Sequence, residues 1–168
     1  MTMLEIDVLK KTTKFLINRE VLPYRYSIAN KQGSEGKKFQ ERILSVAKDT
    51  GFHPTFSPIG ADIVGVSVSI AEWWQVECKG AGSGTPQTQR NSFDRALASV
   101  VSYYEAIAPE EFKYAKPYLG LALPATQDYL RELKRRVRKP LRQQLNLWVL
   151  LCEFHTDSVR AISPDDEY

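Results

Sequence analysis

The chain has 168 residues, 43% of them hydrophobic and 26% charged, which is typical of a soluble chain that can bury one hydrophobic core. Its formal net charge of +3 is too small to identify a nucleic-acid-binding protein by charge alone. The sequence has no N-terminal signal and no apolar run of about 18 residues, so we expect a cytoplasmic protein of one domain without membrane insertion.

The first third of the chain is predicted to be mainly helical. Residues 4–17 show a weak helical pattern, and residues 22–33 are predicted to form a connection. A second helix is predicted over residues 36–49, because apolar side chains recur there at helical spacing and Gly51 follows as a C-terminal glycine. We therefore expect an N-terminal helix and connection over residues 1–33, before the core.

Residues 60–68 and 73–80 are predicted to form a β-hairpin. Both segments are rich in β-branched and aromatic residues, and the stretch between them can serve as the turn. The hairpin brings Asp62 back to Glu77 and Lys79. Because side chains alternate along a strand, Glu77 and Lys79 share one face while Cys78 points to the other. The sequence therefore predicts two carboxylates and one ammonium group at one end of a sheet.

The rest of the chain is predicted to alternate between helices and strands. The glycine-rich residues 80–86 are expected to form a flexible loop. The further elements are a helix over 93–104, a strand over 118–124, a basic helix over 127–139 with Thr126 as its cap, a strand over 145–154 and a short piece over 158–162. The core is thus predicted to span residues 34–162, followed by an acidic tail at 163–168. This order predicts an α/β fold with a central mixed β-sheet flanked by helices.

The two cysteines and two histidines do not indicate a zinc site. Cys78 and Cys152 each lie in an apolar run, so we expect reduced thiols in the core. His53 and His155 are far apart and lack the spacing of zinc ligands.

The carboxylates of the predicted hairpin have a chemical use. Carboxylate oxygens suit Mg²⁺ or Mn²⁺, which also accept phosphate oxygens. A bound ion of this kind can activate water for attack on phosphorus, and Lys79 can orient or help deprotonate that water or neutralise charge on the phosphate. The alternative is structural, because a Glu-x-Lys pair on a strand is usually a solvated ion pair and an aspartate before a strand is often a turn residue. The spacing and the apolar strands that carry these residues favour the functional interpretation.

Asp62, the Glu77-x-Lys79 pair and their strand context resemble the active-site signature of the PD-(D/E)XK nuclease superfamily. Ala61 stands where the family name has a proline. The predicted element order over residues 34–155 is similar to the core of that superfamily, and the motifs are most similar to its Holliday-junction-resolvase and restriction-endonuclease-like branches. The resemblance implies a restriction-endonuclease-like core and a metal-dependent endodeoxyribonuclease that hydrolyses phosphodiester bonds by water attack.

The resemblance also implies roles for individual residues. Asp62 and Glu77 would bind Mg²⁺ or, in its place, Mn²⁺, the backbone carbonyl of Cys78 would add a ligand, and Lys79 would assist the water. A glutamate on the first core helix often adds a metal contact in this superfamily. The matching residue is Glu41, with Glu35 as its substitute, although the helical position of Glu41 also fits a solvated side chain.

Two further groups of residues are candidates for binding nucleic acid. In related nucleases, the helix after the catalytic strand places polar side chains near the scissile phosphate, and the candidates here are Gln87, Gln89, Arg90 and Arg95. The basic run from Lys134 to Arg142, which includes Arg135 and Arg138, fits contacts with a DNA backbone. Both groups have an ordinary alternative as solvated surface.

The expected substrate is duplex or branched DNA, and a homodimer is consistent with cutting both strands. One alternative is a non-catalytic DNA-binding or interaction protein with a nuclease fold, against which the intact set of Asp62, Glu77 and Lys79 argues. Another is a nuclease subunit that is active only within a larger complex, such as a transposition or repair assembly. The small size of the chain, without an added recognition domain, keeps this second alternative open.

Overall fold

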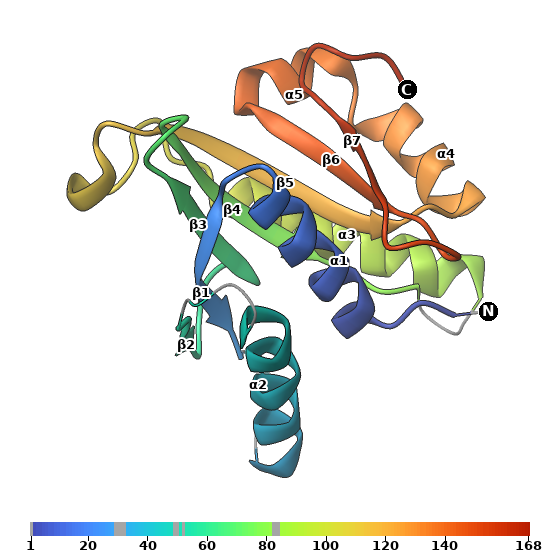
Figure 1. Ribbon diagram of the computed structural model, residues 1–168. Helices are drawn as coiled ribbons and strands as arrows, with labels where there is room; N and C mark the ends of the chain where they lie inside the picture. Colours follow the sequence, from blue (N-terminus) through green and yellow to red (C-terminus); the bar gives the residue numbers. More distant parts are fainter. Residues whose placement is uncertain (1, 29–32, 49–50, 52, 82–84) are drawn as a thin grey trace.

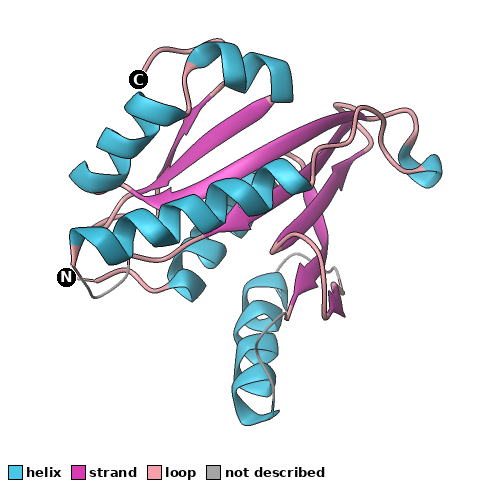
Figure 2. Cartoon of the chain, turned by 180° about the vertical axis from the view of Figure 1, so that it is seen from behind, coloured by secondary structure: helices cyan, strands magenta, loops and turns pink. Residues whose placement is uncertain are grey.

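A seven-stranded mixed β-sheet runs through the molecule, with helices on both of its faces (Figures 1 and 2). The structure is a computed structural model that describes residues 2–28, 33–48, 51, 53–81 and 85–168. Its elements are α1 (Glu5–Asn18), β1 (Leu22–Ser27), α2 (Gly33–Ala47), β2 (Thr55–Ser57), β3 (Ile63–Ser67), β4 (Glu72–Cys78), α3 (Pro86–Ser102), η2 (Glu110–Phe112), β5 (Lys116–Pro124), α4 (Gln127–Arg136), α5 (Lys139–Leu145), β6 (Leu147–Cys152) and β7 (Val159–Ile162). None of the helices described is both long and apolar enough to cross a membrane.

The sheet has the strand order β2-β1-β3-β4-β5-β6-β7. Strands β1, β3 and β4 are antiparallel neighbours. The chain then crosses through α3 to β5, which is parallel to β4, and β6 is in turn parallel to β5. The edge strands differ, since β2 is parallel to β1 and β7 is antiparallel to β6. The predicted α/β class, with a mixed sheet flanked by helices, is confirmed.

Strands β3 and β4 form the predicted hairpin. Ser67 pairs with Glu72 at the turn, and Ile63 pairs with Val76 at the open end. Asp62 comes directly before β3, so this register places it beside the last residues of β4. The hairpin therefore positions the predicted charges through local pairing alone.

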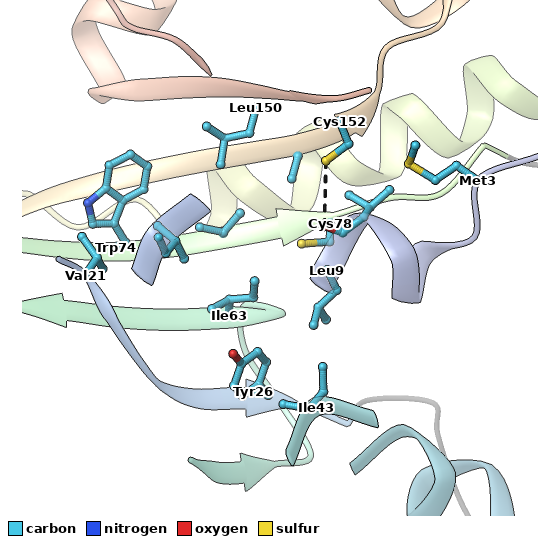
Figure 3. Packing of buried hydrophobic residues seen from close by; sticks show 14 of the residues in the cluster. Met3, Leu9, Val21, Tyr26, Ile43, Ile63, Trp74, Cys78, Leu150 and Cys152 are labelled. Atoms are coloured by element: carbon cyan, nitrogen blue, oxygen red, sulfur yellow. Dashed lines mark hydrogen bonds between the residues drawn. The ribbon is translucent and has the colours of Figure 1, made fainter. Parts of the chain in front are cut away.

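The two faces of the sheet are covered by different helices. On one face, Leu9 and Leu16 of α1 pack in a cluster with Trp74 and Cys78 of β4 (Figure 3). On the other face, Phe93 of α3 and Leu133 of α4 pack in a cluster with Leu121 of β5 and Val149 of β6. Both faces are therefore buried, which explains why the adjacent Trp73 and Trp74 are 3% and 0% exposed although they point in opposite directions.

The N-terminal region is part of the same core as the rest of the chain. Residues 22–27 form strand β1, so the prediction of a connection there was wrong. Pro23 lies in this strand, and proline normally argues against a strand because it lacks a backbone N–H. The ladder between β1 and β3 shifts register between Pro23 and Arg25, and this irregularity accommodates the proline.

Smaller differences concern the ends of elements. The predicted basic helix over 127–139 ends at Arg136, and a second helix, α5, begins at Lys139. Pro140 explains the break, because proline suits the first turn of a helix but not its interior. Residues 53–57 contain the short strand β2, and the piece at 158–162 contains strand β7.

Candidate active site

The C-terminal end of β4 gathers the charges predicted from the sequence. An oxygen of the Asp62 carboxylate, Oδ2, accepts a hydrogen bond from the backbone N–H of Cys78 at 2.8 Å. Glu77 is only 8% exposed, and Lys79 directly follows the strand, where its backbone N–H donates to the carbonyl oxygen of Ala122 at 2.9 Å. As the hairpin predicts, Asp62, Glu77 and Lys79 lie close enough for their charges to interact.

A third carboxylate, from Glu5 at the start of α1, joins this group. Its Oε2 lies 3.1 Å from Nζ of Lys79. The backbone permits this approach because Gly80 has no side chain: a Cβ there would lie 2.5 Å from the backbone nitrogen of Glu5. The backbone N–H of Ala81 also donates to the carbonyl of Met3 at 2.8 Å. A glycine after Lys79 is therefore what lets the first turn of α1 reach the site.

A tyrosine from the end of α3 holds Glu77 in place. The hydroxyl of Tyr103 donates to Oε2 of Glu77 at 3.0 Å. The carbonyl of Tyr103 accepts a hydrogen bond from Nε2 of Gln75, also on β4, at 2.7 Å. Sequence reasoning missed both Glu5 and Tyr103. Tyr103 caps the C-terminus of α3, and no local pattern in the sequence distinguishes it from its neighbours.

The electrostatics of the group follow from burial and from the number of carboxylates. Burial, together with the negative charge of Asp62, raises the pKa of Glu77 to about 7, although the hydrogen bond from Tyr103 and the charge of Lys79 act in the opposite direction. Burial acts to lower the pKa of Lys79, but the charge and hydrogen bond of Glu5, together with the charges of Glu77 and Asp62, outweigh it, so that pKa is raised. The group therefore combines three carboxylates with one ammonium group and attracts cations.

Asp62 and Glu77 supply carboxylate oxygen atoms, the ligand type that a hard divalent cation such as Mg²⁺ prefers. Across the described part of the chain, no three Asp, Glu, His or Cys side chains stand together as a ready-made metal cage. Mg²⁺ does not require such a cage, because it commonly binds one or two carboxylates and completes its shell with water and substrate phosphate oxygens. A cation here would also offset the repulsion that raises the pKa of Glu77.

The structure does not bring Glu41 to this group. Glu41 is exposed on α2 and lines a hollow with Lys48 and His53. Glu35, its predicted substitute, is exposed in the first turn of the same helix. The helix carboxylate that contacts Lys79 is Glu5, on the helix that packs against the sheet.

Two of the predicted nucleic-acid contacts lie close to the site. Gln89 and Arg90 of α3 line a hollow shared with Tyr129 and Arg131 of α4. The hydroxyl of Tyr129 donates to the carbonyl of Gly80 at 2.8 Å, so this hollow adjoins the residue after Lys79. The Oε1 atom of Gln89 is buried and has no hydrogen-bond partner among the residues that the structure describes.

The other predicted contacts are exposed and have ordinary surroundings. Gln87 donates to Oδ1 of Asn91, four residues along α3, at 2.9 Å. Arg95 is exposed on the same helix. Arg135 lies 4.0 Å from a carboxylate oxygen of Glu132 on α4, and Arg138 is exposed at the start of α5. These positions permit nucleic-acid contacts without indicating them.

Comparison with protein-family models, curated proteins and solved structures finds no match for this chain. No relative therefore supplies a function for the group formed by Asp62, Glu77, Lys79 and Glu5. Its chemistry follows from its own residues, which are oxygen ligands and a protonated amine at an edge where the side chains of Lys79 and Glu5 are 30% and 33% exposed.

Proposed function

We propose that this protein is a metal-dependent endodeoxyribonuclease that hydrolyses DNA phosphodiester bonds. The observation that carries the proposal is the grouping of Asp62, Glu77 and Lys79 at the end of β4, with Glu5 of α1 beside them. The path of the chain supports it. A helix, a hairpin that bears the charged residues, a crossover helix and a parallel strand follow one another here as in the restriction-endonuclease-like core that the resemblance implies.

In this proposal the carboxylates of Asp62 and Glu77 hold the ion. Asp62 is fixed by the backbone N–H of Cys78, and Glu77 is fixed by the hydroxyl of Tyr103, so both oxygen donors are oriented before an ion arrives. A bound Mg²⁺ or Mn²⁺ would supply positive charge for the phosphate and favour ionisation of water.

The raised pKa of Lys79 favours a role as a cation over a role as a general base. A lysine that acts as a general base needs a lowered pKa, whereas Glu5 keeps Lys79 protonated. Lys79 therefore acts as a cation: its N–H groups orient the attacking water and neutralise the charge that develops on the phosphate. Glu5 holds the ammonium group in position for both tasks.

The test is cleavage of supercoiled plasmid and of a four-way DNA junction by the purified protein with Mg²⁺, Mn²⁺ or EDTA. We expect metal-dependent cutting that is abolished in Asp62→Asn. In Lys79→Ala it should fall by about 100-fold or more, the usual effect of removing one group that stabilises the transition state. A folded wild-type protein that binds DNA but does not cut it in either metal would contradict the proposal and favour a binding protein.

A matched pair of variants separates the two candidate helix carboxylates. Glu5→Gln removes the charge beside Lys79, so we expect slower cutting. Glu41→Gln makes the same chemical change at an exposed position on α2, and we expect the wild-type rate. Slow cutting by Glu41→Gln with normal cutting by Glu5→Gln would restore Glu41 to the site.

A further inference from the structure

Helix α2 projects from the body of the molecule beyond the end of the sheet (Figures 1 and 2). It has 15 residues, which corresponds to a length of about 22 Å. Phe39 and Ile43 attach one side of it to the core cluster that also contains residues of α1. The remaining surface of the helix is exposed along most of its length.

The exposed surface of α2 carries basic side chains that form no ion pair with the residues that the structure describes. Lys37, Lys38 and Arg42 are exposed, and within the described residues no carboxylate forms an ion pair with any of them. Basic residues elsewhere are commonly paired. Examples are Lys14 with Asp157, Arg136 with Asp94 and Glu132, and Lys139 with Glu167. The cations of α2 are therefore available to an anionic partner.

Two of these cations face the side of the molecule on which the candidate active site lies. Lys38 and Arg42 line a hollow together with Glu35 and Phe39 of the same helix and with Ile6 of α1. Ile6 follows Glu5, whose carboxylate contacts Lys79. One turn of α1 thus borders both the charged group and the hollow beside α2.

We propose that the edge of α2 formed by Lys38 and Arg42 binds the sugar–phosphate backbone of DNA next to the cleaved bond. This inference rests on the proposed function, since it takes DNA as the substrate. The two side chains are four residues apart and hence lie on the same side of the helix, about 6 Å from each other. Cations without protein partners gain free energy by neutralising phosphates and releasing counterions. Such contacts position the duplex without reading its sequence.

The test measures the affinity for a fluorescently labelled DNA duplex in EDTA, where no cutting occurs, as a function of NaCl concentration. The variant Lys38→Ala/Arg42→Ala is compared with Lys113→Ala/Arg160→Ala, which removes the same charge from exposed positions before β5 and on β7. We expect the plot of log affinity against log salt to become less steep by about 1.8 in the α2 variant, because each phosphate contact contributes about 0.9.

Further arms of the experiment separate this inference from the proposed function. The exchange Lys38→Arg/Arg42→Lys keeps both charges and should restore the wild-type salt dependence. A slope that is reduced in Lys38→Ala/Arg42→Ala but not in the control variant supports the inference, whether or not wild type cuts DNA. Failure of wild type to cut DNA would overturn only the proposed nuclease activity. Equal slopes in the α2 and control variants, with normal cutting by both, would overturn the inference and leave the nuclease intact. A wild-type protein that neither binds nor cuts would overturn both.

Discussion

Replacing Glu77 with glutamine is expected to stabilise the metal-free protein at alkaline pH. Glutamine keeps the shape of the side chain and can still accept the hydrogen bond from Tyr103, but it carries no charge. Glu77 has a pKa of about 7 in the folded protein against an ordinary value of 4.5, first because of burial and then because of Asp62. Ionised Glu77 therefore destabilises the folded state, and the variant removes this cost.

The sign and the size of the effect follow from the pKa difference. Well below the ordinary pKa, Glu77 is protonated in both the folded and the unfolded chain, so it has no effect on stability. As the pH rises, the unfolded chain loses the proton first, and stability falls until the folded pKa is passed. At about 1.4 kcal/mol for each pKa unit, the full cost is about 3 kcal/mol. Between about pH 5 and pH 8 it grows by about 2 to 3 kcal/mol.

Urea denaturation in EDTA measures this cost directly. The free energy of unfolding of Glu77→Gln minus that of wild type should be larger at about pH 8 than at about pH 5 by about 2 to 3 kcal/mol. The control Glu41→Gln, at an exposed position, should differ from wild type by less than about 0.5 kcal/mol at both pH values. Adding Mg²⁺ at the higher pH should stabilise wild type more than Glu77→Gln.

A difference between Glu77→Gln and wild type that does not change with pH would refute this reasoning. It would mean that Glu77 ionises in the folded protein as easily as in water. Burial and the charge of Asp62 would then not raise its pKa.

Two further substitutions test the packing that supports the site. Gly80→Ala should lower the free energy of unfolding by about 1 to 3 kcal/mol, because the new Cβ would collide with the backbone of Glu5; an unchanged urea midpoint would contradict this. Arg19→Met should cost about 2 kcal/mol, since it removes the charged partner of the buried Glu72 carboxylate, which Arg19 contacts at 2.6 and 2.9 Å. Adding Glu72→Gln should recover part of that loss in a double-mutant cycle, and simple additivity of the two changes would disprove the coupling.

The sequence by itself determined the hairpin and the charges that it carries. Residues 60–80 contain two β-branched and aromatic runs joined by a short turn, so their pairing depends on neighbours in the chain and not on distant contacts. That pairing is enough to bring Asp62 to Glu77 and Lys79. The capping of α4 was equally local, because the Thr126 hydroxyl accepts from the backbone N–H of Tyr129 three residues later.

Only the tertiary structure decided which other residues complete the site. The local sequence did not predict strand β1, because Pro23 argues against a strand. Pairing with β3 overrides that local preference. Glu5 reaches Lys79 because α1 packs across the sheet and Gly80 leaves room for its first turn, and Tyr103 reaches Glu77 because α3 ends over β4. The periodicity of each helix indicates which face is buried, but not which strand that face will meet. The partners of Lys79 and Glu77 therefore depend on how distant segments pack together.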